Sequence, residues 1–357
     1  MMNKVARYRG ISNGRAITKE PGYIYVTEGG VTLVDELGKE HVMPAKEGDG
    51  ASENSDASAD MAAILARLQM LEDKVVSMRR TNSDSVVAEQ GVPVSASDPS
   101  KDYVISGETS QTASITAKSV EMDGMSIALP SGAALTNGNG LFISASDEVV
   151  VSGSEVSMDR STSSNCIKVV EADSMTIRDT TFSGRTYNTI MTGQNCTAFL
   201  KNMIVDNCDF AEECRHINIW FGGFQDNATL TISNCHFRGG EQFLCIGDYA
   251  GHGNRLTVNI VNCSIDQYEK DGTEYEGIIL LDSRKSAAGM FESDNPFGRI
   301  SINFSNVTVA GERLTADNFV MGSGGSGQML YIYKAGDRAN VPYTPETAHL
   351  FPTVSFR

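Results

Sequence analysis

Thiol and imidazole groups are the side chains of this sequence that could bind a metal ion or attack a substrate. The seven cysteines are an odd number, no two of them form a Cys-x-x-Cys pair, and the five histidines show no ligand spacing. Zinc sites are normally built from such pairs, so the sequence predicts no metal. The start of the chain shows no secretion signal, and structural disulfides are therefore not expected. The cysteines are predicted to be small interior side chains rather than catalytic thiols.

Carboxylates are the other groups with a chemical use, because paired acids hydrolyse glycosidic bonds. The reaction needs two carboxyl groups about 5 to 9.5 Å apart on one accessible face. Asp179 with Asp206, and Asp248 with Asp282, could meet this spacing if they lie on neighbouring strands about 4.8 Å apart. Proximity alone marks these pairs, and a chain with 45 acidic residues supplies such pairs by chance. We therefore predict no catalytic residues, with polysaccharide cleavage as the alternative.

A glycine-rich run from Gly322 to Gly327 (GSGGSG) invites comparison with a phosphate-binding loop. It lacks the Lys-Ser/Thr that ends such a loop and holds the phosphates and their magnesium ion. The sequence therefore predicts no nucleotide, and no other cofactor motif is present.

An acidic and aromatic segment between Asp266 and Asn295 is a candidate for ligand contact. It interrupts a repeat of otherwise nearly constant length, and insertions in repeat proteins form surface loops that often carry recognition. The candidate ligand residues are Asp266, Tyr268, Asp271, Glu274, Tyr275, Glu276 and Asp282. Solvated decoration without any ligand explains the same composition equally well.

The elements that must position these groups are built from an eight-residue repeat. Apolar side chains occupy positions one, three and eight, and a turn-forming residue occupies position five. Seven copies begin at Val120, Val149, Met175, Met203, Leu230, Val258 and Ile302, with separations of 29, 26, 28, 27, 28 and 44 residues. A period of this size indicates a solenoid, in which each turn of the chain buries its apolar face against the next.

Each period also contains a second short apolar run, as at 166–169, 217–219, 244–246 and 278–280. Alternation within the runs predicts strands, and clusters of Asn, Gly, Ser and Asp between them predict turns. Position five holds residue types that tolerate a left-handed backbone, which predicts a sharp bend in each period. These residues are Gly124, Gly153, Asp179, Asn207, Asn234, Asn262 and Asn306; Cys208, Cys235 and Cys263 follow three of them.

From about residue 115 to 325 this pattern resembles the right-handed parallel β-helix of pectate lyases and phage tailspikes. The resemblance concerns architecture and includes no catalytic motif. It implies a mainly β fold with a body of about seven coils.

A heptad pattern lies ahead of the repeat. Its apolar residues are Met61, Ile64, Leu68, Leu71, Val75 and Met78, with alternating separations of three and four. A strict seven-residue repeat keeps one narrow apolar stripe against a partner helix, so the sequence predicts a coiled coil over 58–80. An amphipathic helix packed on a globular core is the alternative, although such a helix normally shows a wider stripe.

Within the heptads, the run Arg67-Leu68-Gln69-Met70-Leu71-Glu72 resembles the R-h-x-x-h-E pattern of parallel trimeric coiled coils. In this register Arg67 and Glu72 occupy positions g and e, so the guanidinium can reach a carboxylate on the neighbouring helix. The resemblance implies a homotrimer. At about 1.5 Å per residue the helix is only about 30 Å long, which is marginal alone in water, so other parts of the trimer must help to hold it.

The remaining segments complete the expected domain order. Residues 1–44 contain two alternating runs around Glu28-Gly29-Gly30, which predicts a small β-hairpin unit that serves as an anchor on a partner. Residues 45–57 predict a flexible linker, and 81–118 a connecting segment with an N-terminal cap. The β-helix is expected over 119–325 and a C-terminal cap over 326–357, because open ends of a solenoid invite unwanted pairing.

The charge of the chain excludes some classes of partner. With 29 basic and 45 acidic residues the formal net charge is −16, which argues against nucleic acid or an anionic membrane as the main partner. No segment has the length and apolarity of a membrane span, and the start lacks a signal peptide. The sequence thus predicts synthesis in a host cytoplasm without export.

This domain order resembles that of bacteriophage appendage proteins, whose N-terminus plugs into the particle while the distal body faces the environment. The resemblance implies a homotrimeric head fibre or capsid decoration in the virion, held on a capsid or tail protein through residues 1–44. The body would be structural and could bind a host-surface glycan by avidity. The alternatives are a tail fibre or tailspike that cleaves host polysaccharide and, disfavoured by the missing export signal, a host-encoded trimeric adhesin.

Overall fold

The computed structural model describes most of the repeat-bearing region and the strands of the N-terminal unit. The described residues are 83–159, 164–192, 200–210, 214–247, 254–266, 278–282, 297–322, 329–334 and 339–357, and the backbone of 7–10, 23–27, 30–34 and 40–44. Outside them lie the predicted trimerisation residues Met61, Ile64, Arg67, Leu68, Leu71, Glu72, Val75 and Met78 and the linker 45–57. The chain divides into two compact units, Met1–Val75 and Val76–Arg357.

The N-terminal unit contains a four-stranded sheet. Strand β1 (Arg7–Gly10) is parallel to β2 (Tyr23–Thr27), which is antiparallel to β3 (Gly30–Val34), and β3 is antiparallel to β4 (Glu40–Pro44). The β2–β3 pair corresponds to the two alternating runs around Glu28-Gly29-Gly30. The unit therefore holds more strands than the single hairpin expected from the sequence.

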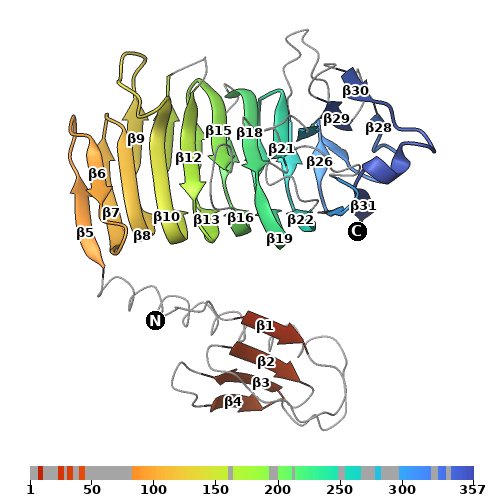
Figure 1. The fold of residues 1–357 in the computed structure, drawn as a ribbon, viewed down its shortest axis with the longest axis horizontal. Helices are drawn as coiled ribbons and strands as arrows, with labels where there is room; N and C mark the ends of the chain where they lie inside the picture. Colours follow the sequence, from red (N-terminus) through yellow and green to blue (C-terminus); the bar gives the residue numbers. More distant parts are fainter. Residues whose placement is uncertain are drawn as a thin grey trace. The chain divides into compact units, whose positions relative to one another are not determined.

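The second unit is mainly β and is dominated by parallel pairing (Figure 1). Strands three apart in chain order pair with one another, as β13 (Ser174–Arg178) does with β16 (Leu200–Asp206) and β16 with β19 (Phe224–Ser233). Successive turns of the chain thus stack on one another. We call each such turn a rung, and most rungs contribute one strand to each of three sheets.

Sheet 1 runs through the whole stack. Its order is β5 (Asp84–Ala88), β7 (Asp102–Thr109), β8 (Ala113–Asp123), β10 (Asn139–Ser152), β13, β16, β19, β22 (Leu256–Val261), β25 (Ile300–Ser305) and β31 (Thr353–Phe356). The first residues of the seven repeat copies, from Val120 to Ile302, lie opposite one another in this sheet. One period of the sequence is therefore one rung.

Sheets 2 and 3 complete each rung. Sheet 2 contains β6 (Val94–Ser97), the first halves of β8 and β10, β12 (Asn165–Glu171), β15 (Thr186–Thr192), β18 (Cys214–Gly222), β21 (Gln242–Gly247), β24 (Ile279–Asp282) and β29 (Leu330–Lys334). Sheet 3 contains the end of β7 and the short strands β9 (Ser126–Leu129), β11 (Glu155–Met158), β14 (Thr181–Ser183), β17 (Asp209–Phe210), β20 (His236–Phe237), β23 (Ser264–Ile265) and β26 (Thr308–Val309).

The last described elements fold back on the end of the stack. Strand β27 (Glu312–Arg313) is antiparallel to β26, and β30 (Ala339–Val341) is antiparallel to β29. Strand β28 (Met321–Gly322) pairs in parallel with β29, and a short 3-10 helix covers Ala348–Leu350. No helix among the described residues is long and apolar enough to cross a membrane.

The bend predicted at position five is confirmed in every copy of the repeat. All seven residues there have a positive φ, between 51° and 61°. Side-chain amides connect several of these bends from rung to rung. Nδ2 of Asn207 donates to Oδ1 of Asp179 at 2.6 Å, and Nδ2 of Asn306 donates to Oδ1 of Asn262 at 3.0 Å. The residue types that permit the bend thus also bond one rung to the next.

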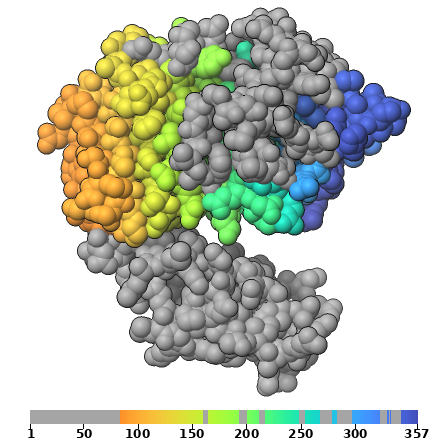
Figure 2. Space-filling model, in the orientation of Figure 1, coloured from red at the N-terminus to blue at the C-terminus, as the bar shows by residue number. Residues whose placement is uncertain are grey.

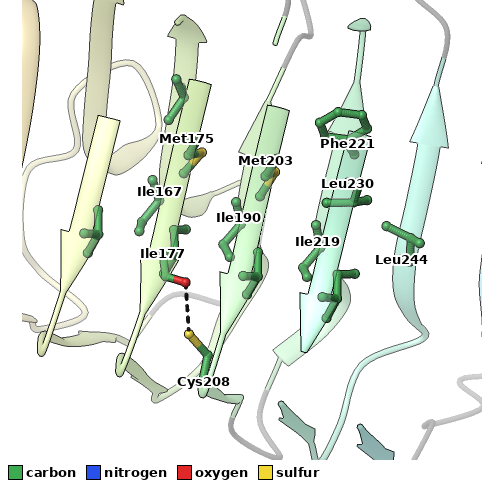
Figure 3. Packing of buried hydrophobic residues seen from close by; sticks show 14 of the residues in the cluster. Ile167, Met175, Ile177, Ile190, Met203, Cys208, Ile219, Phe221, Leu230 and Leu244 are labelled. Carbon is green, nitrogen blue, oxygen red and sulfur yellow. Dashed lines mark hydrogen bonds between the residues drawn. The ribbon is translucent and has the colours of Figure 1, made fainter. Parts of the chain in front are cut away.

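The interior of the stack is filled by rows of apolar side chains. Ile167, Ile190, Ile219 and Leu244 are paired in register in sheet 2, and Met175, Met203 and Leu230 in sheet 1 (Figure 3). These residues are 1% exposed or less. At position eight, the ring of Phe210 stacks on Phe182 and Phe237 with centroid distances of 4.9 and 4.5 Å. Burial of these rows against the next rung is the main stabilising contribution.

In the space-filling view, the described residues of the stack form successive bands in chain order (Figure 2). The stack extends beyond the boundaries that the sequence predicts for it. Residues 81–118 are expected to connect and cap, yet β5, β6 and β7 are parallel members of the sheets. Residues 326–357 are expected to form a cap, yet β29 pairs with β24 and β31 with β25. Parallel pairing uses backbone groups, so strands can join the stack without the side-chain pattern of the repeat.

Candidate functional site

The cysteines at position six are interior residues, as predicted. Cys208, Cys235 and Cys263 are each 1% exposed. The Sγ of Cys208 donates to the carbonyl oxygen of Ile177 at 3.7 Å (Figure 3). The hydrogen bond to the Cys208 thiol, together with burial, raises the pKa of Cys235 well above the usual range of a thiol, and Cys235 and burial do the same to Cys263. A nucleophilic cysteine needs the opposite shift, because the thiolate is the reactive form.

The carboxylates that could have formed a hydrolytic pair are engaged in structural contacts where the structure describes them. Asp206 Oδ1 accepts hydrogen bonds from Ser233 Oγ at 2.6 Å and from Asn234 Nδ2 at 2.8 Å. Asp179 accepts from Asn207. Asp248 lies outside the described residues. These acids connect the bends of neighbouring rungs, which explains their position without any reaction.

A charged cluster lies on the outer side of sheet 3. It consists of Asp209, His236, Arg238 and Asp266, which occupy positions seven and nine of the repeat, on either side of the buried residue at position eight. Side chains on the two sides of a buried strand position point outward. Asp209 belongs to β17, His236 to β20, and Asp266 follows β23, so the cluster spans three consecutive rungs.

Imidazole, guanidinium and carboxylate groups are in direct contact within the charged cluster. His236 Nε2 and Asp266 Oδ2 are 2.5 Å apart, and His236 Nδ1 is 3.7 Å from Asp209 Oδ1. Arg238 Nη2 donates to Asp209 Oδ2, and its Nε donates to His236 Nδ1 at 3.4 Å. With the proton on Nε2, the imidazole donates to Asp266 and accepts from Arg238. The four side chains are 37 to 47% exposed, so solvent reaches them.

The two carboxylates of the charged cluster are engaged with partners inside it. Asp209 is paired with Arg238, and Asp266 with His236. Elsewhere on the chain, three carboxyl groups have shifted pKa values, and the general acid of a glycosidase needs a raised pKa. Hydrogen bonds from Ser100, Arg255 and Thr344 hold the pKa of Asp98, Asp226 and Glu346, respectively, below the usual range of a carboxyl group. Those three acids are therefore shifted in the direction opposite to that of a general acid.

One of the four residues of the charged cluster, Asp266, is among the candidate ligand residues predicted from the sequence. Its side chain is exposed. Asp282 is not a loop residue: it ends β24 and is fully buried. Tyr268, Asp271, Glu274, Tyr275 and Glu276 lie outside the described residues. Asp209, His236 and Arg238 were missed, although the template already places their positions next to the buried residue eight.

Trp220 lies on the outer face of sheet 2 but is covered rather than open to solvent. Met191, Trp220, Cys245 and Leu280 lie opposite one another in register and form, with Ile217, a second apolar cluster. Trp220, the single tryptophan of the chain, is 5% exposed. Stacking of a sugar on an exposed indole is therefore not available at this position.

Neither a metal site nor a related protein of known function indicates what the described residues do. Within the described ranges, no group of three or more His, Cys, Asp or Glu side chains could hold a metal ion. Comparison with protein-family models, with curated proteins and with solved structures returned no match.

Proposed function

We propose that this chain is a non-enzymatic structural protein of a bacteriophage virion, a homotrimeric head fibre or capsid decoration. Its body would be a right-handed parallel β-helix, residues 58–80 its trimeric coiled coil, and residues 1–44 its anchor on a capsid or tail protein. The observation that carries the proposal is the continuous parallel pairing of sheet 1 from β5 to β31. A stack of this kind makes an elongated, rigid body whose core lies within one chain.

A structural role agrees with how the reactive groups are used. The described cysteines are buried, and Asp179 and Asp206 hold bends together. These groups therefore contribute to the stability of the stack. This favours an inert body over a depolymerase.

Binding of a host-surface glycan is the adhesive part of the proposal. The charged cluster offers half-exposed donors and acceptors on sheet 3, which suit the hydroxyl groups of a sugar. One such contact is weak. Three copies in a trimer, and many trimers on a particle, would multiply it by avidity.

The location is tested by immunogold labelling of phage particles from cells that carry the gene, with particles from a deletion strain as control. Gold on the heads of the first particles alone is the expected result. Protein that stays in the lysate, with unlabelled particles, would refute the virion assignment.

The absence of catalysis is tested by incubating the purified full-length protein with host capsule or lipopolysaccharide. We expect the size distribution of the glycan to stay unchanged. Shortened glycan would overturn the non-enzymatic assignment in favour of a tailspike depolymerase. Repeating the incubation with Asp209→Asn and Asp266→Asn would then show whether the charged cluster is responsible.

A further inference from the structure

The outer face of sheet 1 is a long, regular surface. One row of outward-facing residues can be followed through every strand of the sheet by its register. The row is Ser85, Val104, Glu121, Val150, Thr176, Ile204, Thr231, Asn259, Asn303 and Ser355. Ile204 lies in the middle and is 42% exposed, which makes it one of the few exposed large apolar side chains among the described residues.

Most outward positions on the half of this face beyond Ile204 are uncharged; Asp226 of β19, which is paired with Arg255 just ahead of β22, is charged. The uncharged outward residues of β19, β22, β25 and β31 include Thr229, Thr231, Ser233, Thr257, Asn259, Val261, Ser301, Asn303, Ser305, Thr353 and Ser355. They are short, and some bond to one another: Asn303 Nδ2 donates to Asn259 Oδ1 at 3.0 Å, and Ser355 Oγ donates to Asn303 Oδ1 at 2.7 Å. These positions are therefore uncharged, and hydrogen bonds already order some of their side chains.

A largely uncharged face is informative in a chain with a formal net charge of −16. Identical acidic chains repel one another, so they can pack closely only where few acids are present. Short side chains held by their neighbours also lose little conformational entropy on association. Both properties suit contact with a second copy of the same chain.

The connection to the predicted coiled coil points to the same sheet. The heptad region ends at Arg80, and the first strand of sheet 1 begins at Asp84. Four extended residues span at most about 14 Å, which is the greatest distance that can separate the start of β5 from the end of the heptad region. The predicted helix is too short to hold three chains alone, which requires a second contact region.

We propose that the outer face of sheet 1, centred on Ile204, packs against the other two copies in the trimer. This inference rests on the proposed homotrimer and adds to it the surface of the body that is buried. The occupant is another copy of this chain. A glycan on the same face is the competing outcome that the experiment separates.

The test compares Ile204→Glu with Val320→Glu in the full-length protein. Val320 is 44% exposed and lies outside sheet 1, so the two variants introduce the same charge at equally exposed aliphatic positions. We expect Ile204→Glu to raise the dissociation constant of the trimer at least tenfold in native mass spectrometry over a dilution series. Val320→Glu should behave as the unsubstituted protein, and the circular dichroism of both variants should be unchanged.

The possible results distinguish a failure of this inference from a failure of the proposed homotrimer. A trimer that resists Ile204→Glu as well as it resists Val320→Glu would overturn the inference and leave the homotrimer standing. Loss of glycan binding in Ile204→Glu with an unchanged trimer would also overturn it, in favour of a glycan face. An unsubstituted protein that is monomeric at micromolar concentration would overturn both.

Discussion

At the scale of single residues, the thiols inside the bends give the simplest test of the structure. The hydrogen bond with a neighbouring thiol, together with burial, raises the pKa of Cys235 and Cys263, so both stay protonated as the pH rises past the usual pKa of a cysteine, about 8.5. We expect Cys208, Cys235 and Cys263 to resist iodoacetamide at about pH 8.5 in the folded protein and to react fully in urea. Peptide mass spectrometry distinguishes the three sites, and rapid alkylation of Cys235 in the folded protein would contradict the buried position.

A second residue-scale prediction concerns Asp226. Arg255 donates to it from its guanidinium, at 2.7 Å to Oδ2, and from its backbone N–H, at 3.0 Å to Oδ1, and these bonds hold the pKa of Asp226 well below the usual range. A carboxyl group with a lowered pKa stabilises the fold above its unfolded pKa, about 3.9, and loses that contribution as the pH falls through the folded pKa. In Arg255→Gln we expect the pKa of Asp226 to move up toward its usual value, measured by NMR of the carboxyl carbon.

The shift in Arg255→Gln should be partial, because the backbone donor remains. Arg313→Gln is the matched control, since Arg313 is an exposed arginine elsewhere in the stack. An unchanged titration of Asp226 in Arg255→Gln would show that the guanidinium does not hold this carboxylate in solution.

At the scale of elements, the bends between sheets 1 and 3 should depend on both the backbone and the amide of position five. Asn234 has a φ of 54°, donates to Asp206 at 2.8 Å and accepts from Asn262 at 3.2 Å. Asn234→Ala loses these bonds and puts into the left-handed region a residue that tolerates it less well than Asn, so it should cost more than about 1 kcal/mol. Asn234→Gly loses the bonds but keeps the backbone free, so its cost should be nearer 1 kcal/mol.

Urea unfolding of both Asn234 variants measures these free energies. Equal destabilisation by Ala and Gly would mean that the left-handed backbone contributes nothing, contrary to the geometry. If neither variant changes the free energy of unfolding, the hydrogen bonds of the Asn234 amide do not stabilise the bend either.

The phenylalanine stack should show how locally a rung is stabilised. Phe237 lies between Phe210 at 4.5 Å and Phe243 at 5.3 Å. Phe237→Ala should cost about 3 to 5 kcal/mol, because it leaves a cavity in a close-packed interior. Since each rung contacts only its neighbours, hydrogen exchange should quicken in β17, β20 and β23 while β5 and β6 stay protected. Uniform acceleration throughout the stack would argue against stabilisation rung by rung.

These elements also show which features a sequence reveals. The bends were predictable because their backbone restricts position five to Gly, Asn and Asp, and the rows because apolar positions recur once per rung. The end strands β5 and β31 were not predictable, because they pair in the stack without carrying the eight-residue template, although Phe356 of β31 stacks on Phe304. The charged cluster was not predictable from the sequence. Its contacts among Asp209, His236 and Asp266 depend on the register of three neighbouring rungs.

At the scale of the whole molecule, the proposed trimer has two contact regions of different kinds, an apolar seam and a largely uncharged sheet face. Changing Leu68 and Leu71 to serine removes the centre of the seam, so we expect the trimer to dissociate at higher concentration. The body should keep its β-sheet circular dichroism, because its core lies within each chain. Gln69→Ser, on the outer side of the same predicted helix, is the control and should leave the trimer unchanged.

The two regions hold the same three chains, so their effects should be coupled. Once the seam is weakened, the sheet 1 face alone must keep the copies together, and a charge at Ile204 then has no compensating contact. We expect the triple variant Leu68→Ser, Leu71→Ser and Ile204→Glu to be monomeric at concentrations where the seam variant and Ile204→Glu are each still partly trimeric, as measured by sedimentation velocity. A triple variant that dissociates no more readily than the seam variant would place the second contact region elsewhere on the molecule.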